Sequence, residues 1–165
     1  MPLVDTLLPE FDHEMATTRR LLDRVPDAAL GWKPHDKSMA LGHLSGHLAN
    51  LLLWCTTVLE TTTFDLADAE AMRKPPPASR EALLKDFDGK LSVARASLIK
   101  RTDAELLAPW TLKKNGDVVF TLPRISALRS FVMNHSIHHR GQLTVYLRLK
   151  DVPLPPVYGP TADEQ

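Results

Sequence analysis

The chain has 165 residues, 44% of them hydrophobic, and its 20 basic residues balance 20 acidic ones to a formal net charge of zero. This length suffices for one domain with a substantial core, and we expect a single domain over residues 1–165. The balanced charge argues against binding to nucleic acid or to an anionic membrane, and no apolar run reaches the roughly 20 residues that cross a bilayer.

The first predicted helix runs from about Leu3 to Arg24 and ends before Pro26. Asp12, His13 and Glu14 are consecutive residues of metal-binding types, but consecutive residues point in three directions around a helix, so we interpret them as a solvated face. Apolar residues and one threonine, spaced alternately four and three apart, form a seam suited to bundle packing. They are Val4, Leu8, Phe11, Met15, Thr18, Leu22 and Val25.

The second predicted helix runs from about Met39 to Leu59, with Ser38 as its N-cap. His47 lies at the flank of the apolar stripe, whereas His43, one turn earlier, is rotated toward the surface. His47 is therefore the better metal ligand, and His43 is a candidate for the rim of a site or for support behind a ligand. The stripe consists of Leu44, Leu48, Leu51, Cys55 and Val58. Trp54, Cys55 and Met15 could line a pocket, but core packing is the default interpretation.

A connection of nineteen residues, 60–78, is far longer than an antiparallel helix pair requires. It can carry the chain along the whole bundle, which predicts that the second and third helices are parallel. Ser79 is a suitable N-cap for the third helix, which extends to about Lys100, and Asp86 and Asp88 are interpreted as surface charges on it.

A small hairpin is predicted between the third and last helices. Residues 102–105 read as a capping-box turn, and Asn115-Gly116 lies between two strand-like runs, which is a hairpin signal. Pro123 then begins the last helix, where its missing N–H is harmless. Trp110 and Arg124 are interpreted as packing and solvated residues.

The longest helical pattern spans residues 125–149 and holds three of the seven histidines within five residues. At about 100° per residue, His135 and His139 fall on the apolar side, whereas His138 is rotated well away. Two imidazoles one turn apart can reach one divalent ion, provided that a third ligand comes from elsewhere. The apolar side consists of Ile125, Leu128, Val132, Ser136, Leu143 and Tyr146.

Three features of the sequence form one pattern: one histidine in the second long helix, N-H-x-x-H-H-R-G-Q over residues 134–142 and V-Y-G-P-T-A-D-E over residues 157–164. In these three features the sequence resembles the DinB/YfiT family of small metalloproteins. The resemblance covers nearly the whole chain and implies an all-α four-helix bundle, up-down-down-up, that commonly forms a homodimer. It implies one metal ion held by His47, His135 and His139, with water at the open positions. Members with assigned activities resemble thiol-dependent transferases and isomerases or metal-dependent hydrolases, and others carry only a damage or stress label. The family-like tail is expected to fold back on the bundle.

A site with three histidine ligands and open positions is catalytic in type, since structural zinc sites close with four protein ligands. Zinc, or else nickel, would make hydroxide from water or hold the thiolate of a low-molecular-weight thiol; the lack of a carboxylate beside the histidine pair favours the second. Gln142 would hydrogen-bond a metal-bound water or a small-molecule substrate, or else pack between helices. The alternative is a protein that binds metal without catalysis, as a stress-response or interaction protein.

No other catalytic motif competes: G-x-S-x-G, H-E-x-x-H, C-x-x-C and a glycine-rich phosphate loop are all missing from the sequence. The single cysteine, Cys55, excludes an intramolecular disulfide, and the N-terminus lacks the pattern of a signal peptide. We therefore expect a cytoplasmic protein.

Overall fold

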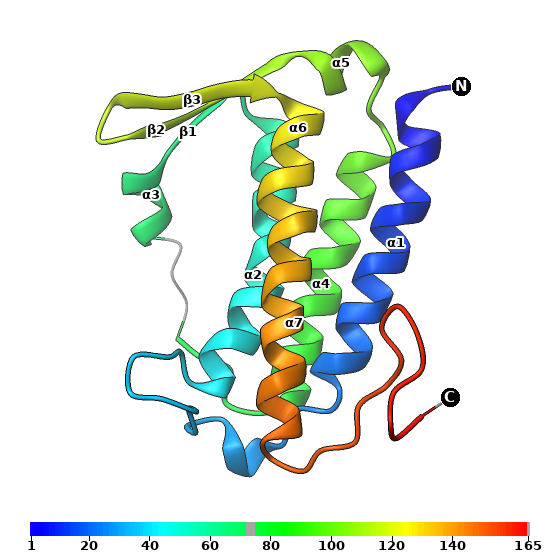
Figure 1. The fold of residues 1–165 in the computed structure, drawn as a ribbon. Coiled ribbons are helices and arrows are strands. Elements are labelled where there is room, and N and C mark those ends of the chain that lie inside the picture. Colours follow the sequence, from blue (N-terminus) through cyan, green and yellow to red (C-terminus); the bar gives the residue numbers. More distant parts are fainter. Residues whose placement is uncertain (72–74, 165) are drawn as a thin grey trace.

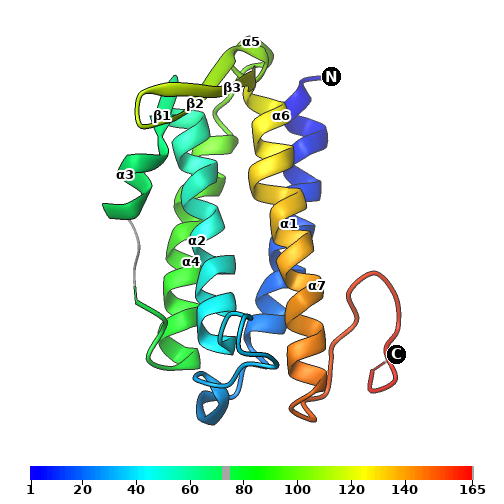
Figure 2. The ribbon, with the colours of Figure 1, turned by 60° about the vertical axis from the view of Figure 1, so that its left-hand side comes forward.

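Four long helical rods form the body of the molecule, and a small sheet lies across one end (Figure 1 and Figure 2). The structure, a computed structural model, describes residues 1–71 and 75–164. The fourth rod consists of three consecutive segments, α6, the π-helical segment η2 and α7. The bounds are Leu3–Leu22 for α1, Leu41–Glu60 for α2, Arg80–Leu98 for α4, Arg124–Leu128 for α6, Arg129–Asn134 for η2 and His135–Arg148 for α7.

The helices α2 and α4 run side by side in the same direction (Figure 1). Lys90 Nζ donates to Asn50 Oδ1 over 2.6 Å, and Arg101, just after α4, binds Glu60 Oε1 at 2.5 Å. Later residues of α2 thus contact later residues of the other segment, as parallel helices require. The long connection allows this arrangement. It contains strand β1 (Thr63–Asp65) and the short helix α3 (Leu66–Ala71).

The core lies between the four rods, where the predicted inward faces are buried. In α2, all five predicted inward residues have at most 1% exposure, and burial of each large apolar side chain contributes about 1.5–3 kcal/mol. The default interpretation of Met15 and Cys55 as core residues is confirmed, and burial raises the pKa of the Cys55 thiol to about 12. The α2 residues are Leu44, Leu48, Leu51, Cys55 and Val58.

The hairpin prediction is confirmed, but an all-α fold is too narrow a description. Strands β2 (Pro109–Lys114) and β3 (Asp117–Pro123) are antiparallel and joined by Asn115 and Gly116, both with positive φ. Strand β1 adds in parallel to β2. The carboxylate of Asp65 accepts from the backbone N–H groups of both turn residues, at 2.9 and 2.7 Å, and thereby fixes the third strand to the hairpin.

The sequence pattern predicts one uninterrupted last helix, but the structure interrupts it with the π-helical segment η2. A π-helix pairs residues i and i+5, so each turn holds more residues than an α-turn. This explains why buried positions 128, 132 and 136 recur every four residues without drifting off the inner face. The wider turn also lies directly before His135, where α7 begins.

Helix ends and caps agree in part with the sequence. Ser79 accepts from the Ala82 N–H, and Thr102 forms a capping box with Glu105, as predicted. Ser38 is not the N-cap of α2: the helix begins at Leu41, after Ala40, and has no side-chain cap. The backbone N–H of Leu41 instead donates to the carbonyl of Trp32, at 2.8 Å. A hydrogen bond to the preceding loop thus takes the place of the expected side-chain cap.

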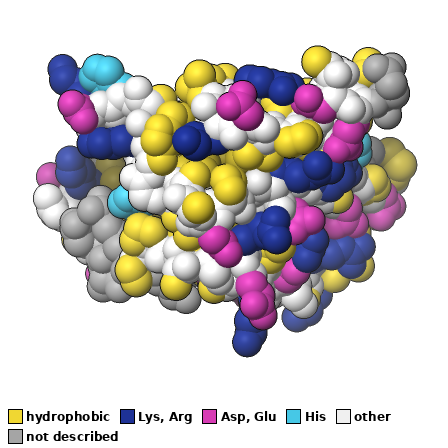
Figure 3. Space-filling model, turned by 90° about the horizontal axis from the view of Figure 1, so that it is seen from below, with side chains coloured by type: hydrophobic (Ala, Val, Ile, Leu, Met, Phe, Trp, Pro, Cys, Tyr) yellow, Lys and Arg dark blue, Asp and Glu magenta, His cyan; other side chains and the backbone are white. Residues whose placement is uncertain are grey.

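The C-terminal segment folds back along the bundle, as expected (Figure 1). Arg148 forms a 2.5 Å ion pair with Asp163, and Arg24 binds Glu164 at 2.6 Å. The end of the bundle beneath α7 carries basic and acidic side chains beside one another, with hydrophobic groups between them (Figure 3). Within the described residues, no helix has the length and apolar character needed to span a membrane.

Candidate metal centre

Three histidines from two rods meet between α2 and α7. His47 lies in the second turn of α2, His135 opens α7, and His139 follows one turn later. Their ligand atoms all lie within 4.8 Å of one another. His139 is 9% exposed, and the other two are half-buried. The structure therefore brings together the three histidines singled out in the sequence, close enough to hold a metal ion.

The inner nitrogens converge at distances typical of ligands to a shared ion. His47 Nε2 lies 3.3 Å from His135 Nε2, which lies 2.9 Å from His139 Nε2. Two imidazole nitrogens bound tetrahedrally to one zinc ion, each at about 2.1 Å, stand roughly 3.4 Å apart. The spacing of the donor set thus fits a small divalent ion.

The outer ring nitrogens of His135 and His139 are already occupied as donors. His139 Nδ1 donates to Gln142 Oε1 over 2.7 Å. The ring of His135 is hydrogen-bonded to the backbone carbonyl of Phe131, within the π-helical segment. A neutral imidazole carries one N–H, so in both neutral rings Nε2 presents a lone pair. Two lone pairs facing each other at 2.9 Å repel unless a cation lies between them.

Protonation of these rings is disfavoured. Burial, followed by the neighbouring His139 and His135, lowers the pKa of His47 to about 4. Burial is also the main cause that lowers the pKa values of His135 and His139. The rings are consequently neutral near pH 7, which is the state that binds metal.

His43 and His138 lie outside this group, as their positions in the sequence indicated. Both are exposed. His138 Nε2 accepts a 3.2 Å hydrogen bond from Gln142 Nε2, so one amide group connects His138 and His139. Gln142 is therefore placed to orient the ring of His139 from behind, whereas its contact with a metal-bound water or a substrate stays a prediction.

An ionic cluster on another face of α7, built on the buried residues Glu14 and Arg140, was missed. The interpretation of Glu14 as part of a solvated face is wrong: it is 6% exposed and lies 2.6 Å from Arg140, which is 1% exposed. The Tyr158 hydroxyl donates to Glu14 at 2.9 Å and accepts from Arg140 at 2.5 Å. The sequence signal was present, since Arg140 continues the buried four-residue spacing through Val132 and Ser136.

The two aspartates of α4 that we interpreted as surface charges both have basic partners. Arg19 Nε donates to Asp88 at 2.7 Å, and Lys90 Nζ binds Asp86 one turn away on the same helix. The Asp88 pair is about 44% exposed, so it contributes little to stability.

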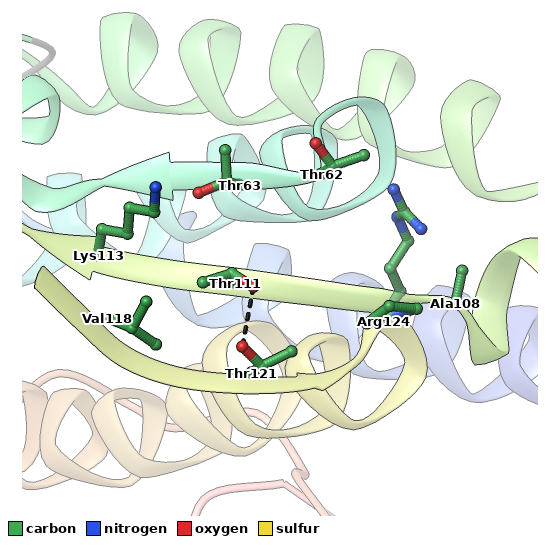
Figure 4. A pocket seen from close by; sticks show the side chains of 9 residues that line it. Thr62, Thr63, Ala108, Thr111, Lys113, Val118, Thr121 and Arg124 are labelled. Carbon is green, nitrogen blue, oxygen red and sulfur yellow. Dashed lines mark hydrogen bonds between the residues drawn. The ribbon is translucent and has the colours of Figure 1, made fainter. Parts of the chain in front are cut away.

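A hollow of about 590 Å³ lies at the far end of α2, beside the outer face of the sheet (Figure 4). Thr111 and Thr121 on this face share a 2.9 Å hydrogen bond. At its edge, Arg124 donates to the carbonyls of Val58 and Thr61, at 3.0 and 2.9 Å, and so caps the end of α2. None of its described lining residues is a histidine, so the hollow is separate from the candidate metal centre.

Comparisons with known proteins point to one family. The model of the DinB family matches residues 1–165. The chain is 24% identical over 162 residues to the uncharacterized protein YrdA of Bacillus subtilis (strain 168), covering 98% of this chain and 91% of that protein.

Two solved structures of DinB-like proteins are similar in fold. That from Bacillus subtilis has a TM-score of 0.71 at 20% identity and covers 93% of this chain and 97% of its own. That from Bacillus cereus ATCC 10987 has a TM-score of 0.72 at 22% identity, with coverages of 95% and 98%. From the match over the whole chain, we conclude that this protein belongs to the DinB family.

Proposed function

We propose that this protein is a metal-dependent enzyme with one divalent ion, zinc or else nickel, held by His47, His135 and His139. The observation that carries the proposal is the convergence of three Nε2 atoms, two of them from rings whose other nitrogen is a donor. We further propose the up-down-down-up order of the DinB bundle, which the parallel course of α2 and α4 supports.

The donor set favours a catalytic over a structural site. Among the described residues, the cluster that could hold a metal contains three histidines, and no cysteine, aspartate or glutamate adds a fourth ligand to it. Structural zinc sites normally close with four protein ligands, whereas catalytic ones keep a position for water or substrate. A bound divalent ion would supply Lewis acidity, to water or to a thiol.

The residues of this chain would fix the ligands. Gln142 holds the His139 tautomer with its lone pair inward, and the Phe131 carbonyl does the same for His135. Among the described residues, the histidine cluster contains no aspartate or glutamate that could act as a general base, and Glu14 is engaged by Arg140 and Tyr158 in a separate cluster. This favours transfer or isomerisation with a low-molecular-weight thiol over hydrolysis.

Elemental analysis after purification without chelators or metal columns tests the proposal. We expect about one zinc or nickel ion per chain. Near-zero content that excess zinc or nickel does not restore would contradict metal binding. A metal-loaded protein inactive toward electrophiles with every common cellular thiol, and inactive as a hydrolase, would instead support the non-catalytic alternative.

We also propose a homodimer in the cytoplasm. Several large apolar side chains are exposed on the chain, among them Val93, Val145 and Leu149, at 56–58%. Sedimentation equilibrium at high micromolar concentration should give twice the chain mass of 18.4 kDa, and a monomer there would contradict the assembly.

A further inference from the structure

Aromatic side chains flank the three histidines along the seam between α2 and α7. Trp54 lies seven residues, about two turns, after His47 on α2. Phe131 lies four residues before His135 in the other rod, and its carbonyl binds that ring. The two rings approach each other across the seam, with centroids 6.4 Å apart. The seam thus passes directly from polar ligands to aromatic surface.

Two further rings from the sheet complete an aromatic quartet, which we define as Trp54, Phe64, Phe120 and Phe131. Phe64 of β1 meets Trp54 edge-on at 5.3 Å, and Phe120 of β3 stacks on Phe131 at 5.1 Å. Four different elements, α2, β1, β3 and η2, contribute one ring each. All four rings are only half-buried, although they pack against the core.

The quartet has the composition of a wall of a small-molecule site. Such sites combine aromatic side chains with a few polar or metal groups that fix orientation. Here the histidines provide the polar groups within one to two helical turns, and none of the quartet residues is charged. Rings that remain half-exposed near the three histidines would gain by covering their faces with a planar apolar group.

The aromatic pair on the other side of the histidines is less suited to this task. Trp32 and Tyr146 meet edge-on at 5.9 Å, but Lys150 Nζ already lies over the Trp32 ring at 5.2 Å. Tyr146 is seven residues from His139, the same separation as that of Trp54 from His47. The pair therefore provides a matched control within the same chain.

We propose that the aromatic quartet binds an aromatic or planar apolar part of the substrate, whose polar reacting group lies at the three-histidine centre. This inference rests on the proposed function and adds the class of substrate, a small molecule with an aryl group close to a metal-binding or electrophilic group. The charged amino-acid parts of a thiol cosubstrate would lie away from the quartet.

The test compares two chelating probes on zinc-loaded protein, benzohydroxamate and acetohydroxamate, by isothermal titration. They share the metal-binding group and differ in the phenyl ring, whose burial should make the first bind at least about tenfold tighter. Trp54→Leu should remove most of this preference and leave acetohydroxamate binding unchanged. Trp32→Leu, the matched control, should retain it. An equal preference in wild type and Trp54→Leu, or an equal loss in both variants, would overturn the inference.

A second measurement separates this inference from metal binding itself. In metal-free protein, benzamide should shift the indole N–H resonance of Trp54 in a nitrogen-15 spectrum and leave that of Trp32 in place, with the signals assigned from the two variants. The zinc content of each sample tests the proposed function alone. If benzamide shifts neither indole or both equally, the quartet is not the aromatic site, whether or not zinc binds.

Discussion

Two polar clusters lie on different faces of α7, and the neighbouring residues His139 and Arg140 contribute to them. His139 belongs to the three-histidine cluster and Arg140 to the cluster with Glu14 and Tyr158. The second is complete in itself, because a guanidinium, a carboxylate and a hydroxyl satisfy one another. The first consists of three neutral bases directed at one point. The charges of one cluster are thus compensated within the chain, whereas in the other the proposed cation would compensate the facing lone pairs.

The comparison separates a stabilising role from a functional one. Removal of one member of the ionic cluster leaves a buried charge without a partner, so folding should be affected. Removal of one histidine relieves repulsion in the metal-free protein and should affect metal binding. Substitutions in the two clusters should therefore give opposite patterns of stability and metal affinity.

The largest effect is expected from His139→Ala, which should lower zinc affinity by orders of magnitude. His138→Ala, the matched control one residue away, should leave the affinity within a few-fold because His138 is exposed. His139→Ala should also abolish the metal-dependent rise in melting temperature, since an ion stabilises only the state that binds it. Isothermal titration of both variants decides; the reverse ranking would contradict the assignment.

Glu14→Leu should destabilise the protein by about 3–5 kcal/mol, because it leaves the buried Arg140 without its carboxylate. The double variant Glu14→Leu with Arg140→Met should recover much of this loss, since both charges are then gone. Urea unfolding of the metal-free proteins measures both effects. Equal stability of Glu14→Leu and wild type would show that the pair does not hold α7 against α1.

Gln142→Leu should lower zinc affinity about 10- to 100-fold without a comparable loss of stability, because His139 loses the partner that fixes its tautomer. Gln142→Glu should retain binding, since a carboxylate oxygen can accept the same hydrogen bond. If Gln142→Leu binds zinc as tightly as wild type, the amide does not orient the ligand.

The smallest effect concerns Tyr158, whose loss of the hydroxyl in Tyr158→Phe should cost about 1 kcal/mol. Tyr158 is 65% exposed as a residue, but partial desolvation beside the buried Glu14, and then the hydrogen bond to Glu14, raise the pKa of Tyr158 above its ordinary value of 10. The neutral hydroxyl is favoured in the folded state, so its contribution is complete below pH 10 and is lost as the pH rises through the folded pKa. Unfolding between pH 9 and 11.5 should show wild type losing its advantage over Tyr158→Phe; a constant difference would contradict this.

The sequence predicted the long helices, the hairpin and the inward histidines because these depend on local periodicity and turn chemistry. Leu44 and Leu48 are apolar at helical spacing, and Asn115-Gly116 supports the positive φ values that its turn requires. His139 was distinguished from His138 by the same periodicity. Helix spacing also favoured His47 over His43, and the family resemblance then added its combination with the pair in the last helix.

What the sequence missed depends on contacts between distant segments. Strand β1 is only three residues long and exists because β2 and the Asp65 carboxylate hold it. The Glu14 and Arg140 pair spans 126 residues, and a charged residue by itself favours solvent. The π-helical segment was missed because a π-turn adds only about one residue to the helix, which barely changes the periodicity of the apolar residues over the whole segment.

The most direct test of the metal centre is a crystal structure of zinc-soaked protein, with anomalous data collected on both sides of the zinc edge. We predict one strong peak per chain, bonded to the Nε2 atoms of His47, His135 and His139, with Gln142 still hydrogen-bonded to His139 Nδ1. The three rings without a peak between them, or a peak at His43 or His138 instead, would contradict the account.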